Sequence, residues 1–83
     1  MPTATLSPDT RTLVRDRLAV YGAILNAGDE IERNNRPLKV TIREAGKRLR
    51  FESAGTGALL FTGPLAATAV DRFVTSFWFW TAI

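Results

Sequence analysis

The sequence has neither cysteine nor histidine among its 83 residues. Without cysteine the chain forms no disulfide, no thiolate metal site and no thiol nucleophile. Without histidine it has no Ser-His or Cys-His catalytic pair, no histidine general base and none of the usual zinc or haem ligands. We therefore expect a protein that is not an enzyme and that binds no cofactor and no metal. Catalysis by carboxylates alone, through Glu44, Glu52 or Asp71, stays open as the alternative.

We also expect no secretory signal, because the start "MPTATLSPDTRTL" has no charged stretch followed by an apolar run. Together with the absence of cysteine, this predicts a cytoplasmic location. Residues 53–70 carry no charge and reach the length of a membrane span, but they contain three glycines and a proline. The alternative that stays open is a small membrane-associated accessory protein, with the apolar C-terminal segment at the bilayer surface beside a basic hairpin.

Residues 8–33 have the pattern of a first helix, preceded by a flexible N-terminus at residues 1–6. Ser7 provides a capping hydroxyl, Pro8 suits the first helical position, and an acid follows in the first turn. Apolar residues recur at helical spacing from Val14 onward through the segment. Gly28 either ends this helix or is tolerated within it, and the stretch "NNRP" at residues 34–37 breaks it.

Residues 38–62 have the pattern of a basic hairpin followed by a short third strand. Residues 38–43 and 48–53 alternate apolar and polar side chains around the turn "EAGK", in which Glu44 and Lys47 can pair. A turn at residues 45 and 46 sets Ile42 opposite Leu49 and Arg43 opposite residue 48, and a register one or two residues different is the alternative. The apolar run at residues 58–61 is either a strand buried on both faces or a packed loop.

Residues 64–81 are expected to form a second, aromatic helix that opens at Gly63 and Pro64. A length of 83 residues predicts one domain with a small core. The expected fold is therefore a small single-domain α+β fold in the order α-β-β-(β)-α, with an antiparallel hairpin or sheet packed on two helices.

Basic residues are concentrated in the hairpin region, where residues 33–50 hold seven cations and one acid. Directly opposed like charges destabilise a hairpin, so folding alone gives no reason for arginine to face arginine. An anionic partner, either nucleic acid or an acidic protein surface, does give one. The candidate residues for binding it are Arg36, Lys39, Arg43, Lys47, Arg48 and Arg50. The alternative is a solvated face that protects the sheet from edge-to-edge aggregation.

Aromatic residues gather at the C-terminal end, which holds five of the eight in the chain within residues 73–80. One helix face cannot bury all five, and exposed aromatic clusters usually mark an interface. The candidate interface residues are Phe73, Phe77, Trp78, Phe79 and Trp80. The alternative is that this segment wraps the first helix and fills the core.

The sequence therefore predicts a small non-enzymatic binding, adaptor or inhibitor protein with two working surfaces. The basic hairpin engages the anionic partner, and the aromatic helix mediates self-association or docking on a larger protein as a subunit of a complex. The basic face has no aromatic side chain on which a base could stack, which favours contact with the phosphate backbone or with an acidic protein groove over recognition of bases.

Overall fold

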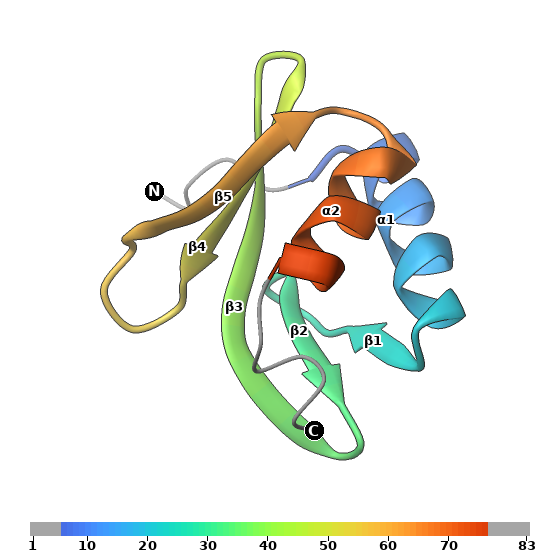
Figure 1. The fold of residues 1–83 in the computed structure, drawn as a ribbon, viewed down its shortest axis with the longest axis vertical. Helices are drawn as coiled ribbons and strands as arrows, with labels where there is room; N and C mark the ends of the chain where they lie inside the picture. Colours follow the sequence, from blue (N-terminus) through green and yellow to red (C-terminus); the bar gives the residue numbers. More distant parts are fainter. Residues whose placement is uncertain (1–5, 77–83) are drawn as a thin grey trace.

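The computed structural model of the protein describes residues 6–76, which form a helix, a five-stranded antiparallel sheet and a second helix. In chain order these are α1 (Pro8–Val20), β1 (Ala23–Leu25), β2 (Glu30–Arg33), β3 (Arg36–Ala45), β4 (Arg48–Ser53), β5 (Leu59–Pro64) and α2 (Ala67–Ser76). The strands lie side by side in chain order, and the long strand β3 runs through the middle of the sheet (Figure 1). The predicted α+β class, with an antiparallel sheet packed on two helices, is confirmed.

Helix α1 begins where the sequence predicts and ends much earlier. The Ser7 side chain accepts a hydrogen bond from the Thr10 backbone N–H at 3.4 Å, which caps the first turn. At the other end Gly22 has a φ of 75°, in the left-handed region, and its N–H bonds to the Ala19 carbonyl at 3.0 Å. Glycine adopts this conformation without a steric penalty and commonly terminates helices. The predicted helix over residues 8–33 is therefore wrong beyond Val20.

The remainder of the expected helix forms the antiparallel hairpin of β1 and β2. Ile31 is fully buried, as a helix stripe would also require, but Ile24 is 54% exposed because alternate strand residues point to opposite faces. Asn34 and Asn35 both have positive φ, at 56° and 62°, and connect β2 to β3 where Arg33 pairs with Arg36. This is the φ pattern of a type I′ hairpin turn, which asparagine tolerates. The "NNRP" stretch thus joins two strands instead of ending a helix.

The pairing of β3 with β4 differs by two residues from the register that the sequence favoured. A difference of one or two residues was the alternative given in the sequence analysis. Its turn consists of Gly46 and Lys47, with Ile42 paired with Phe51 and Arg43 paired with Arg50. Gly46 has a φ of 62°, and glycine at the first of two turn positions is typical of a type II′ turn. A shift of two residues keeps every side chain on its original face. Arginine therefore still faces arginine, but the pair is a different one.

The predicted third strand is present as β5, but it is not buried on both faces as one interpretation expected. It is an edge strand, and Leu59 and Leu60 are 47% and 37% exposed, so it is not buried on both faces. Pro64 belongs to this strand, and α2 begins at Ala67, three residues later than expected. A side chain at Gly63 would meet the Ala69 Cβ at 3.1 Å, so glycine permits the close approach of α2 to the sheet.

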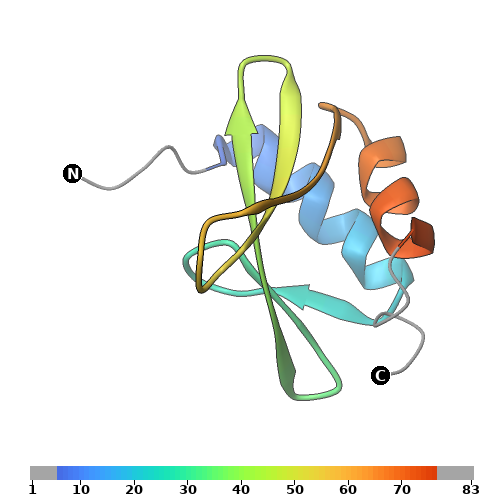
Figure 2. The ribbon, with the colours of Figure 1, turned by 60° about the vertical axis from the view of Figure 1, so that its left-hand side comes forward.

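Both helices cover the same face of the sheet, and the core lies between them and the strands (Figure 2). Phe51 of β4 stacks on Phe73 of α2 with ring centroids 4.4 Å apart, and Phe61 of β5 packs edge-on to Phe51 at 5.8 Å. Leu6 is also buried, and its N–H bonds to the Asp29 carboxylate at 3.3 Å. The flexible N-terminus expected over residues 1–6 therefore does not include Leu6.

Candidate anionic-partner surface

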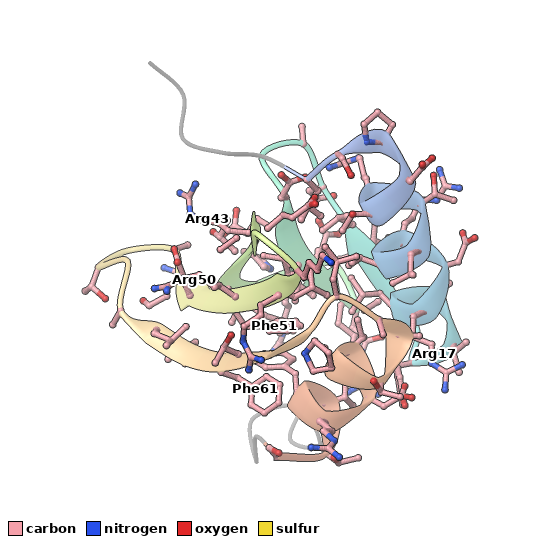
Figure 3. All side chains as sticks on the ribbon, turned by 90° about the horizontal axis from the view of Figure 1, so that it is seen from above. Arg17, Arg43, Arg50, Phe51 and Phe61 are labelled. Carbon is pink, nitrogen blue, oxygen red and sulfur yellow. The ribbon has the colours of Figure 1, made fainter. Side chains whose placement is uncertain are left out.

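The face of the sheet turned away from the helices is called the open face here. Val40, Ile42, Leu49 and Phe51 point into the core, so the side chains that alternate with them along β3 and β4 point outward. The open face includes Glu30 of β2, Thr41 and Arg43 of β3, Arg48, Arg50 and Glu52 of β4, and Leu59 and Thr62 of β5. No helix or strand within residues 6–76 covers it, and Figure 3 shows Arg43 and Arg50 on the opposite side from Arg17 of α1.

The centre of the open face is an ion-pair cluster of Arg43, Arg50 and Glu52, called the arginine clamp here. Arg43 donates from Nε to Glu52 Oε1 at 2.9 Å, and Arg50 donates from Nε to Glu52 Oε2 at 2.8 Å. The two arginines are direct partners across β3 and β4, and the glutamate lies two residues beyond Arg50 on the same face. One carboxylate thus bridges two cations that would otherwise repel each other.

The clamp keeps Glu52 ionised. The hydrogen bond from Arg50 lowers the pKa of Glu52 most strongly, the hydrogen bond from Arg43 lowers it further, and partial burial opposes both. Two guanidinium groups share a single negative charge, so the clamp carries a net positive charge. An anion between the opposed arginines is therefore present in the chain itself.

The turn beside the clamp adds two further cations. Lys47 and Arg48 are exposed, and neither forms an ion pair with another residue of the part of the chain described. Glu44 does not neutralise Lys47 as the sequence suggested, because its Oε1 accepts the Ser7 backbone N–H at 3.0 Å on the helix side. That hydrogen bond lowers the pKa of Glu44. The β3–β4 end of the open face is therefore strongly positive.

The other two predicted cations lie elsewhere. Arg36 is the first residue of β3, beside the β2–β3 turn, and Lys39 lies between the two ends of this strand. Nine residues separate Arg36 from Ala45, which is roughly 30 Å of extended strand. The six predicted binding residues therefore do not form one patch. Arg43, Lys47, Arg48 and Arg50 gather at the β3–β4 end, and the other two do not join them.

A second arginine–carboxylate cluster joins the two helices and was missed in the sequence. Arg17 of α1 donates from Nε and Nη2 to the two Asp71 oxygens of α2, at 2.7 and 2.8 Å. The Tyr21 hydroxyl donates to Asp71 Oδ1 at 2.6 Å. This cluster is called the helix staple here. Hydrogen bonds from Arg17 and then Tyr21 lower the pKa of Asp71, and the bond to Asp71 raises the pKa of Tyr21. The only local signal was the four-residue spacing of Arg17 and Tyr21.

The predicted aromatic interface is corrected at its first residue. Phe73 is fully buried against Phe51 and belongs to the core, so it offers no surface to a partner. The other four candidates, Phe77, Trp78, Phe79 and Trp80, lie outside the described residues. No helix within residues 6–76 is long and apolar enough to cross a membrane. The same residues contain no group of acids that could hold a metal ion.

No protein-family model, no curated protein and no solved structure matches this chain.

Proposed function

We propose that the protein is a non-enzymatic binding module that holds the phosphate backbone of a nucleic acid on the β3–β4 end of its open face. One observation carries the proposal. Four cations gather there, and the ion pairs among them go to one carboxylate, Glu52, on a sheet face that no other described element covers. Folding alone does not favour such an imbalance, because opposed like charges cost stability.

The chemistry of the surface suits phosphate. Arginine presents a planar fork of N–H donors that binds two phosphate oxygens at once, and Lys47 adds a mobile point charge at the turn. The neighbouring open-face residues Thr41 and Thr62 are short, which leaves the guanidinium groups accessible. No aromatic side chain points outward from the central strands β3 and β4, so stacking of bases is not expected there. Binding should therefore depend on charge more than on base sequence.

The proposal is tested with labelled single- and double-stranded DNA and RNA, titrated at salt concentrations from about 50 to 300 mM. The wild-type affinity should fall linearly with salt on a double-logarithmic plot, with a slope that reports several phosphate contacts. Arg48→Glu should weaken binding to all sequences alike and reduce that slope by roughly 1 or more.

The matched control is Arg72→Glu. Arg72 is also exposed, forms no ion pair within the described residues, and lies on α2, on the covered side of the sheet. The same charge reversal there should affect binding much less. Equal losses in the two variants would indicate only a general effect of net charge, and no binding by the wild type at low salt would reject the proposal.

A second surface is proposed from the sequence alone, in which Phe77, Trp78, Phe79 and Trp80 mediate self-association or docking on a larger protein. These four residues follow directly after helix α2 in the sequence. Light scattering coupled to size-exclusion chromatography compares the wild type with Trp78→Ala and Trp80→Ala. A change in mass for the variants and no change for Arg72→Glu would support an oligomer formed through these tryptophans.

A further inference from the structure

We propose that Glu52 is a positioning residue of this binding surface: its carboxylate orients Arg43 and Arg50 toward the partner and stays in place when the partner binds. The inference deepens the proposed function and depends on it. The competing possibility is that Glu52 occupies the anion site and must be displaced before a phosphate can bind. The two possibilities predict opposite effects of removing its charge.

The two oxygens of the Glu52 carboxylate have different arginine partners. Each arginine bonds through Nε to a different oxygen of Glu52, at 2.9 and 2.8 Å. Both guanidinium groups are therefore held at the end nearest the sheet, by the nitrogen closest to the aliphatic chain. An arginine fixed in this way loses less conformational entropy when it binds a ligand. The clamp is thus preorganised for a partner on the open face.

The Glu52 side chain is less exposed to solvent than the two arginine side chains that it binds. The Glu52 side chain is 11% exposed, whereas those of Arg43 and Arg50 are 32% and 41% exposed. The carboxylate lies beneath the guanidinium groups, and an approaching phosphate meets the arginines first. Displacing Glu52 would leave an ionised, poorly solvated carboxylate without its partners, which is costly. The exposure therefore favours a carboxylate that remains in place beneath the bound partner.

The decisive variant is Glu52→Gln, because the two possibilities predict opposite changes in its affinity for polyanions. Glutamine has one acceptor oxygen, and its amide nitrogen would present a donor to the N–H of one arginine. One guanidinium group therefore loses its hydrogen bond to residue 52. We expect polyanion affinity to fall by roughly two- to tenfold, the range for losing one preorganised side chain, although the protein gains positive charge. The salt slope should fall by roughly 1. A displaced competitor would instead give tighter binding.

The matched control is Glu30→Gln, which makes the same change of charge on the same face. Glu30 and Glu52 both pair with Thr41, from its two sides, but Glu30 forms no ion pair within the described residues. The Glu30→Gln variant should bind polyanions as tightly as the wild type or more tightly, with an unchanged dependence of affinity on salt concentration. The inference is overturned if Glu52→Gln binds as tightly as Glu30→Gln or more tightly.

A second pair of variants decides the matter if Glu52→Gln does not fold. Arg50→Lys keeps the charge and the glutamate but removes the oriented guanidinium, and Arg48→Lys makes the same change at a residue outside the clamp. The inference predicts a larger loss for Arg50→Lys, and equal losses contradict it. Absence of wild-type binding rejects the proposed function itself, whereas binding with equal effects in both pairs rejects only the role of Glu52.

Discussion

The helix staple and the arginine clamp differ in their balance of charge. In the helix staple, one arginine and one tyrosine hydroxyl saturate Asp71 and join α1 to α2. In the arginine clamp, two arginines share Glu52 on a sheet face that no other described element covers. The first cluster has no charge left over, whereas the second has one cation in excess.

This difference separates a stabilising interaction from a candidate binding surface. Asp71 has a matched partner, and the pair connects elements 54 residues apart in the chain. Glu52 connects neighbouring strands that already pair through their backbones, so the clamp adds little to the topology. Ionic clusters that leave charge unbalanced and add little to the fold are better explained by a partner than by stability. Substitutions on the covered side of the sheet should therefore change mainly stability, and substitutions on the open side should change mainly binding.

The largest effect is expected from truncating the core on the covered side. Phe73 is fully buried, and Phe73→Ala should reduce the free energy of unfolding by about 3–5 kcal/mol, through lost burial and the cavity left behind. Leu60→Ala, at a side chain 37% exposed on the edge strand, should cost less than about 1 kcal/mol. Urea titration followed by circular dichroism measures both. Similar costs would mean that the two sides of the sheet are not energetically distinct.

A smaller loss is expected from breaking the helix staple, and it should depend on pH. The pKa of Asp71 is lowered in the folded protein, so its ionised form stabilises the fold above the unfolded pKa of about 4. That contribution disappears as the pH falls through the lowered folded pKa. Asp71→Asn should therefore have a lower melting temperature than the wild type at pH 7, and the difference should close in acid.

The control for the staple is Asp16→Asn. Asp16 is 67% exposed, and its ion pair within residues 6–76 is with its neighbour Arg15, at 3.4 Å, so its loss should barely change the melting temperature. Neither variant touches the open face, and both should bind polyanions like each other. A melting-temperature difference for Asp71→Asn that persists unchanged well below pH 3 would contradict the assigned role of its charge.

Parts of the fold were predictable because they depend on short-range patterns. The alternation in residues 38–43 and 48–53 defines the buried face of the hairpin, and a shift of two residues does not alter it. The turns were also encoded locally. Gly22 ends α1, two consecutive asparagines form a type I′ turn, and glycine before Lys47 suits a type II′ turn. The helical spacing of apolar residues after Val20 outweighed these signals and concealed β1 and β2.

The clamp and the staple were not predictable from local patterns. Glu52 bridges Arg43 and Arg50 only in the observed register, since the preferred alternative paired Arg43 with a different arginine. Asp71 meets Arg17 only because both helices cover the same face of the sheet. Sequence reasoning found the excess of positive charge, but the positions of the neutralising carboxylates follow from tertiary structure.

The smallest effect is expected at Lys39, a cation of the predicted set that lies away from the clamp. Its φ is 60°, in the left-handed region that non-glycine residues adopt at a cost. Lys39→Gly should raise the free energy of unfolding by up to about 1 kcal/mol, because glycine removes this strain, and should lower polyanion affinity less than Arg48→Ala, which makes the same change of one charge. Since both variants remove a cation, the pair tests whether position or total charge determines binding. A loss of polyanion affinity at Lys39 as large as that at Arg48 would extend the binding surface along the whole of β3. It would contradict a binding site confined to the β3–β4 end.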